Sequence, residues 1–248
     1  GEEWEVVSLP ALAESKDPLG RKPGEALCPE RYDREALLKR EKKLGPYSFA
    51  ALFQQRPTPL EGALFKREWF ANKVIDAEQV PTKLRWARGY DLAVSQKTSA
   101  DYTASFRCAY DKLGNLYIAD GLRRRMEFPE QRRYVIQRMK TDASTEHGIE
   151  KALHGEALVQ SLRREQAVRH IPFRAIKVDT DKFTRALAWA NLAAEGKVFL
   201  VRGPWNAEFL DEICRFTGKN DAHDDQVDAV SLAVSMLAKR RGKLHLLD

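Results

Sequence analysis

The spacing of hydrophobic and polar residues divides the chain into two parts. Up to about residue 84, clusters rich in proline, glycine and charge interrupt any regular pattern, and two short helices are expected, one after Asp33 and one over 49–55. From residue 85 onward, short apolar runs alternate with longer amphipathic stretches, which is typical of an α/β domain. We therefore expect an N-terminal linker arm over 1–84 and one folded domain over 85–248.

The apolar pattern of the second part predicts three strands in succession and then alternating helices and strands. The expected strands cover residues 85–94, 102–110, 116–120, 147–151, 173–178 and 198–201. The expected helices cover 129–147, 156–170, 206–216, 224–240 and a stretch that begins after the capping residue Asp181. The resulting order begins βββαβα.

Composition narrows the class of protein. The chain has 248 residues, of which 43% are hydrophobic and 31% are charged, as expected for a folded globular protein. No apolar run approaches the roughly 18 residues that a membrane-spanning helix needs. The first residues lack the basic and apolar regions of a secretory signal, so we expect no membrane partner and no secretion. The 42 Lys and Arg against 36 Asp and Glu give a net charge of +6, which permits a polyanionic partner.

Two common kinds of cofactor site are not indicated. Cys28, Cys108 and Cys214 form no CxxC pair, so we expect reduced thiols in a cytosolic compartment and neither a zinc site nor disulfides. The sequence contains neither GxxxxGK[ST] nor GxGxxG. We therefore expect no phosphate loop for ATP or a dinucleotide, and no ATPase activity from this chain.

Two isolated acids lie within or at the end of expected strands. Asp91 interrupts an apolar and aromatic strand, where a lone carboxylate is unfavourable to bury. A purely structural explanation of Asp91 is that its carboxylate accepts backbone hydrogen bonds or pairs with Arg88. Glu150 ends a later strand. A purely structural explanation of Glu150 is a surface ion pair with Lys151 or Arg163.

The strongest single motif is the run His223-Asp224-Asp225-Gln226-Val227-Asp228-Ala229. At about 100° per residue, Asp224, Asp225 and Asp228 share one face of a helix that is apolar and buried along the rest of its length. Acids at a helix N-terminus complement the helix dipole. That role suits one or two acids better than three crowded ones, because like charges repel unless a cation lies among them.

Carboxylates on the first strand, a later strand end and the last helix can converge on a divalent metal. Hard oxygen ligands suit Mg²⁺ or Mn²⁺. Two such ions about 4 Å apart activate water and stabilise the leaving 3′ oxygen in phosphodiester hydrolysis. We therefore expect a site for two divalent ions, Mg²⁺ or Mn²⁺.

This order of elements, with acids at those three places, resembles the RNase H-like (integrase/resolvase) fold, a mixed central sheet flanked by helices. Short stretches in sequence order further resemble the large terminase subunits of tailed phages. They are Leu9-Pro10-Ala11, Asp17-Pro18-Leu19-Gly20-Arg21, Gly24 to Pro29, Phe53 to Pro57, Gly62 to Lys66, Gly89-Tyr90-Asp91-Leu92-Ala93, Ala100 to Ala104, Gly148-Ile149-Glu150 with Gly155, and the motif at 223–229.

The resemblance implies a C-terminal nuclease domain that cuts concatemeric double-stranded viral DNA at the initiation and termination of packaging, by two-metal hydrolysis. The metal ligands that it implies are Asp91, Glu150, Asp225 and Asp228, with Asp224 and Asp101 as less favoured candidates. One departure is that Lys151 and Ala152 follow Glu150 directly, where family members often have an additional Asp.

The same resemblance implies the partners of the full protein. They are an N-terminal ATPase domain, the portal and the small terminase subunit. The arm over 1–84 would lead from that ATPase domain, which this chain lacks. The place of action would be the host cytoplasm, transiently at the procapsid portal.

Clustered positive charge supplies candidate DNA contacts. A run of arginines follows the third expected strand, and a pair follows in the next helix. A charge run is often only a solvated face, but beside a metal site it can contact phosphates. The residues expected to bind DNA are Arg123, Arg124, Arg125, Arg132 and Arg133.

Two other functions are compatible with parts of the pattern. One is another RNase H-like nuclease, of the junction-resolvase or transposase type, and residues 1–66 argue against it. The other is a non-catalytic DNA-docking module of a packaging motor. The gathered carboxylates argue against that module, because a surface that only binds DNA should not collect negative charge.

Overall fold

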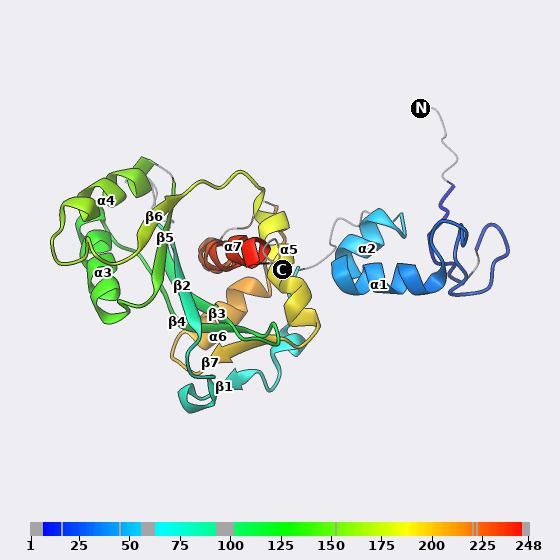
Figure 1. Cartoon of the computed structure of the whole chain (residues 1–248), viewed down its shortest axis with the longest axis horizontal. Helices are drawn as coiled ribbons and strands as arrows, with labels where there is room; N and C mark the ends of the chain where they lie inside the picture. The colour runs from blue at the N-terminus through cyan, green and yellow to red at the C-terminus, as the bar shows by residue number, and fades with distance from the viewer. Residues whose placement is uncertain are drawn as a thin grey trace. The chain divides into compact units, whose positions relative to one another are not determined.

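The computed structural model of the chain describes residues 7–15, 17–44, 46–55, 63–92, 102–151, 153–219, 221 and 223–244. It divides the chain into two compact units, Gly1–Glu61 and Gly62–Asp248 (Figure 1). Residues 63–84, which the sequence pattern assigned to the linker arm, lie in the second unit of this division, and the expected boundary after residue 84 stays a prediction. None of the described helices is long and apolar enough to cross a membrane.

The first unit has a small hydrophobic core of its own. Ala26, Leu37 and Phe49 are buried against one another. Asp33 begins the first helix by accepting a hydrogen bond from the backbone N–H of Ala36 at 2.7 Å, as the sequence predicted. The unit is therefore compact rather than an extended arm. Its helices are α1 (Arg34–Leu44) and α2 (Pro46–Leu52).

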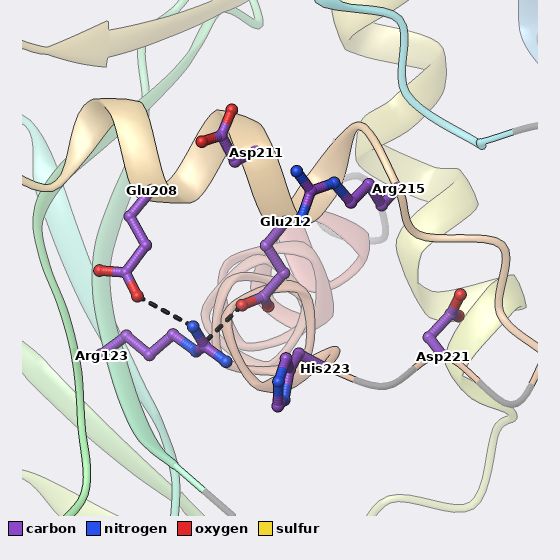
Figure 2. Close-up of a pocket in the computed structure, with 7 residues that line it drawn as sticks. All are labelled: Arg123, Glu208, Asp211, Glu212, Arg215, Asp221 and His223. Carbon is purple, nitrogen blue, oxygen red and sulfur yellow. Dashed lines mark hydrogen bonds and ion pairs between the residues drawn. The ribbon is translucent and has the colours of Figure 1, made fainter. Parts of the chain in front are cut away.

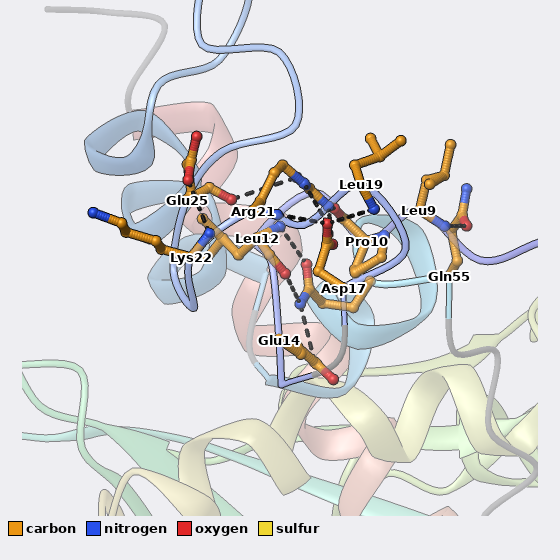
Figure 3. A network of polar contacts seen from close by, with 11 residues as sticks. Leu9, Pro10, Leu12, Glu14, Asp17, Leu19, Arg21, Lys22, Glu25 and Gln55 are labelled. Carbon is orange, nitrogen blue, oxygen red and sulfur yellow. Dashed lines mark hydrogen bonds and ion pairs between the residues drawn. The ribbon is translucent and has the colours of Figure 1, made fainter.

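An ion pair organises the loop that precedes α1 (Figure 3). The Asp17 carboxylate accepts a hydrogen bond from Arg21 Nη2 at 2.6 Å and another from the backbone N–H of Leu19 at 3.0 Å. Arg21 Nη2 also donates to the carbonyl oxygen of Pro10 at 2.9 Å. The hydrogen bond from Arg21 lowers the pKa of Asp17. This pair thus ties the turn at 17–21 to a chain segment that lies outside it.

A seven-stranded mixed sheet forms the centre of the second unit, in the order β1-β7-β4-β3-β2-β5-β6. The pairs β2–β3 and β3–β4 are antiparallel, and the other neighbouring pairs are parallel. This is the mixed sheet that the order of elements predicted. The strands are β1 (Val74–Ile75), β2 (Arg85–Asp91), β3 (Thr103–Tyr110), β4 (Leu116–Arg124), β5 (Glu146–Glu150), β6 (Phe173–Ile176) and β7 (Val198–Val201).

Helices cover both faces of this sheet (Figure 1). On one face, Tyr90 and Ile149 pack against residues of α3 and α4. On the other face, Ala87 packs against Leu232 of α7, which lies beside α5 and α6. The helices are α3 (Phe128–Thr141), α4 (Leu153–Arg164), α5 (Lys182–Ala194), α6 (Asn206–Ile213) and α7 (Asp225–Leu244), with short 3₁₀ helices at Arg67–Phe70 and Ala77–Gln79.

Most expected elements are present with shifted ends. The strand over 198–201 and the helix capped by Asp181 are confirmed, and Asp181 accepts a hydrogen bond from the backbone N–H of Thr184 at 2.8 Å. The helix expected to reach 147 ends at 141, and the third strand continues to 124. The sequence pattern did not predict β1, which has only two residues.

Two glycines allow α7 to lie directly on the sheet. Gly89 of β2 and Gly148 of β5 are register partners in neighbouring parallel strands. A methyl group at Gly89 would overlap the carbonyl oxygen of Ala229 and lie 2.9 Å from the backbone nitrogen of Ala233. A methyl group at Gly148 would instead overlap the sulfur of Met236. The backbones of β2 and α7 are therefore in direct contact.

The opposite face of β2 holds a buried ionic network. The guanidinium of Arg88 is fully buried and donates to Ser105 Oγ at 3.0 Å and to Asp142 Oδ2 at 2.9 Å. It also pairs with Asp120, which accepts a second hydrogen bond from Arg138 at 2.9 Å. Arg88 therefore has partners other than Asp91, and the alternative pairing of these two residues is excluded.

Gly89→Ala should destabilise the second unit by about 3 kcal/mol or more, because backbone atoms of α7 cannot move away without shifting the whole helix. Gly148→Ala is the matched control and should have a smaller effect, of about 1 kcal/mol, because the end of the Met236 side chain can rotate. Urea unfolding monitored by tryptophan fluorescence measures both. Equal losses in the two variants would contradict the backbone contact.

Candidate metal centre

Strand alternation places two of the predicted ligands on the same face of the sheet. Side chains on a strand alternate between faces, so Asp91 shares the α7 face with Ala87, and Glu150 shares it with Gly148. Tyr90 is the register partner of Ile149. One step further along both strands, Asp91 and Glu150 are therefore neighbours at the carboxyl ends of β2 and β5.

The first turn of α7 supplies two more of the predicted ligands. Asp225 begins the helix, and Asp228 lies one position before Ala229, whose carbonyl oxygen faces Gly89. Asp224 precedes the helix, and its carbonyl oxygen accepts a hydrogen bond from the backbone N–H of Asp228 at 2.9 Å. The close packing at Gly89 thus brings the start of α7 over the end of β2.

The four acids Asp91, Glu150, Asp225 and Asp228, which we call the carboxylate cluster, influence one another electrostatically. Burial raises the pKa of Asp91 well above its usual range, and the negative charges of Asp228, Glu150 and Asp225 raise it further. Burial also raises the pKa of the other three. Negative charge is therefore concentrated where water is scarce, which is the condition that a bound cation relieves.

Two cations on α5 face the cluster. Lys182 Nζ lies 3.0 Å from Asp228 Oδ2 and 2.7 Å from Asp224 Oδ2. Arg185 lies 2.9 Å from Asp228 Oδ1, and that oxygen accepts no hydrogen bond. In this arrangement, no three His, Cys, Asp or Glu side chains among the described residues are grouped closely enough to bind one ion. Both oxygens of Asp228 are in contact with protein cations.

Arg123 pairs with acidic residues of α6 beside the start of α7 (Figure 2). Its side chain is 10% exposed and pairs with Glu208 at 2.9 Å and Glu212 at 3.2 Å. Its Nε also lies 3.7 Å from Asp225 Oδ2, and its guanidinium lies 3.7 Å from the centre of the Tyr102 ring. Arg123 therefore contacts Asp225 and two neighbouring acids, and its expected binding to DNA stays a prediction.

Glu212 connects Arg123 to the beginning of α7. Its carboxylate accepts hydrogen bonds from the backbone N–H of Gln226 at 2.7 Å and from Gln226 Nε2 at 2.8 Å. It also lines a cavity of about 300 Å³ beside the carboxylate cluster. The residues that line this cavity are Arg123, Glu208, Asp211, Glu212, Arg215, Asp221 and His223.

The other residues expected to bind DNA differ in their surroundings. Arg124, Arg125 and Arg133 are exposed, and Arg125 lies 4.8 Å from the centre of the Tyr102 ring. Arg132 is half-buried and is bound to Glu165 at 2.7 Å and to Ser161 at 2.8 Å. Asp101, the less favoured ligand, lies outside the described residues.

The sequence prediction missed Lys182, Arg185 and Glu212. Lys182 and Arg185 are three positions apart at the start of a helix capped by Asp181, so they share a face. That spacing was a usable signal. No sequence pattern could predict the role of Glu212, because its partners Gln226 and Arg123 are not near it in the sequence. Lys151, an expected partner of Glu150, instead pairs with Glu156 at 3.0 Å.

Comparison with known proteins identifies the type of domain. The family model of the terminase RNase H-like domain matches residues 88–237. The large terminase nuclease from thermophilic phage G20c with bound magnesium has a TM-score of 0.51 at 16% identity, covering 71% of this chain and 98% of that one. The human cytomegalovirus terminase nuclease domain has a TM-score of 0.53 at 10% identity, covering 69% and 94%. No curated protein sequence matches the chain significantly.

Arg123→Met should lower the free energy of unfolding by about 3 kcal/mol, because it leaves the buried charges of Glu212 and Asp225 without their counter-ion. Arg132→Met is the control, and its loss should stay below about 1 kcal/mol, because the pair with Glu165 is about one-third exposed. Chemical denaturation measures both values. A cost for Arg123→Met as small as that of the control would contradict the assigned role.

Proposed function

Because this chain belongs to the family of terminase RNase H-like domains, we propose that it is a divalent-metal-dependent endonuclease that hydrolyses double-stranded DNA. The substrate would be concatemeric viral DNA, cut at the initiation and termination of genome packaging. In the full protein, the partners would be an N-terminal ATPase domain, the portal and the small terminase subunit. The place of action would be the host cytoplasm, transiently at the procapsid portal.

This proposal is supported by four carboxylates from β2, β5 and α7 that lie near one end of the sheet, where the charges of Asp228, Glu150 and Asp225 act on buried Asp91. These donors fit hard divalent ions, because every oxygen is a carboxylate oxygen. Oδ1 of Asp228 accepts no hydrogen bond and is paired with the charge of Arg185 at 2.9 Å. The raised pKa of Asp91, due first to burial and then to its acidic neighbours, reflects negative charge with too little compensation.

The proposed roles follow from the positions of the residues. Asp91 lies between β5 and α7 and would contact both ions, with Glu150 on one and Asp225 and Asp228 on the other. When bound, two divalent ions lower the pKa of water and stabilise the leaving 3′ oxygen. Arg123 holds Asp225, and the exposed Arg124 and Arg125 at the end of β4 would bind backbone phosphates.

Divalent metals in solved terminase nuclease structures support the choice of metal. One G20c terminase nuclease structure contains magnesium and another contains cobalt. A cytomegalovirus terminase nuclease domain was soaked with manganese and has an inhibitor bound. We accordingly propose Mg²⁺ or Mn²⁺, two ions per domain, for this chain.

The test is incubation of this chain with supercoiled plasmid in Mg²⁺ or Mn²⁺. The parent should nick and linearise the plasmid, and EDTA should prevent cutting. Asp91→Asn and Asp225→Asn should reduce cutting to background, because each removes a charged ligand. Glu165→Gln is the matched control, since Glu165 pairs with Arg132 away from the cluster, and it should cut like the parent.

Intact plasmid in the parent reaction would reject the proposed nuclease. Equal cutting by Asp91→Asn and the parent would reject the assigned site. Retarded DNA migration in a gel-shift assay without any cutting would favour a DNA-docking module.

A further inference from the structure

We propose that Lys182 is an internal counter-ion of the metal centre: it occupies Asp228 in the metal-free protein and must leave before a divalent ion binds. The same geometry assigns Asp224 as the anchor of Lys182 rather than as a metal ligand. This inference rests on the proposed function, because it concerns how the same site accepts its metal.

The contacts of Asp228 are the basis of this assignment. Its side chain is 3% exposed, and a different cation meets each oxygen. Lys182 Nζ lies 3.0 Å from Oδ2, and Arg185 lies 2.9 Å from Oδ1. A divalent ion binds carboxylate oxygen at about 2.1–2.5 Å through the lone pairs that these cations now face. An ammonium group and a metal ion at Oδ2 repel each other and compete for its lone pairs, so the presence of one weakens the binding of the other.

Lys182 is the cation that can leave. It is the first residue of α5, its side chain is 49% exposed, and its four-carbon stem is flexible. The Arg185 side chain is only 11% exposed. Arg185 therefore remains packed against the cluster, whereas Lys182 can turn toward solvent.

Asp224 gives Lys182 a second partner at the edge of the site. Its carboxylate is 21% exposed, against 3% for Asp228, and it lies 2.7 Å from Lys182 Nζ. When Lys182 leaves Asp228, it can keep this contact and remain near the site. The three acids at the start of α7 would therefore have different roles. Asp224 binds Lys182, while Asp225 and Asp228 would bind the metal.

The charge balance of the cluster agrees with this arrangement. Lys182 places a positive charge 3.0 Å from Asp228 and 2.7 Å from Asp224, beside the other acids of the cluster. Without metal, Lys182 therefore stabilises the folded arrangement of the carboxylates. Once metal is bound, the same charge opposes it. Lys182 should thus increase stability without metal and decrease metal affinity.

The experiment measures Mn²⁺ affinity by isothermal titration calorimetry and the melting temperature in EDTA. Lys182→Met removes the charge and keeps most of the side-chain volume. We expect Mn²⁺ to bind about tenfold more tightly, the change expected when a partly exposed ion pair no longer competes. The melting temperature in EDTA should fall. Lys177→Met is the matched control, since Lys177 pairs with the exposed Asp179, and it should behave like the parent.

A double-mutant cycle tests the role of Asp224. If Asp224 only anchors Lys182, Asp224→Asn added to Lys182→Met should leave the Mn²⁺ affinity unchanged. A further loss of affinity in the double variant would show that Asp224 binds metal and would overturn that assignment. Lys182→Gln provides a second charge-free variant, with the same expected increase in affinity, should Lys182→Met fold poorly.

The outcomes separate this inference from the proposed function. An affinity of Lys182→Met and Lys182→Gln equal to or below that of the parent would overturn the counter-ion role while the nuclease proposal stands. Absence of Mn²⁺ binding by the parent and by all variants would overturn the metal centre itself. A purely structural role of Lys182 could lower Mn²⁺ affinity but not raise it.

Discussion

Direct contact between the backbones of β2 and α7 at Gly89 is the constraint on which the second unit depends. It lets the backbone of α7 touch the backbone of the sheet at this point. It also fixes the helix along its axis, because a carbonyl oxygen and a backbone nitrogen of α7 face one glycine. Acids at the ends of β2 and β5 and at the start of α7 meet as a consequence. The packing of main chain against main chain therefore sets the positions of the acids in the cluster. Rotation of side chains cannot change that packing.

The two faces of β2 carry separate groups of buried charged residues, which differ in net charge. On the α3 face, Arg88 is surrounded by Asp120, Asp142 and Ser105, so its charge is matched and hydrogen-bonded. On the α7 face, carboxylates outnumber the cations that contact them, and burial raises their pKa. The first group is balanced in charge, whereas the second has an excess of negative charge that a bound cation would offset. Period-two alternation along one strand keeps the two apart.

Local patterns in the sequence predicted local structure well. Alternation identified the strands, the Asp181 cap was recognisable from its neighbours, and the crowding at 224–228 pointed to the cluster. Local sequence patterns could not identify contacts between residues that lie far apart in the sequence. The short β1 is a strand only because it pairs with β7, more than 100 residues away, and the arginine run could not indicate that Arg123 faces Glu212 while Arg124 faces solvent. Lys182 and Arg185 share one face of a helix that the sequence did predict, but no local pattern indicated that this face lies against Asp228.

A mechanical force applied to the chain from its N-terminal side would act on the second unit first at Leu64 and Phe65. The first described residues of this unit include Leu64, whose backbone N–H donates to the carbonyl oxygen of Phe216 at 2.7 Å, and Phe65, whose buried ring lies 4.0 Å from that of Trp189 on α5. A pull from the N-terminal side would meet these anchors before it reached β1, and β1 before the inner strands. Because Lys182 and Arg185 of α5 contact Asp228, a load carried from Phe65 to α5 would reach the carboxylate cluster without passing through the strands of the sheet.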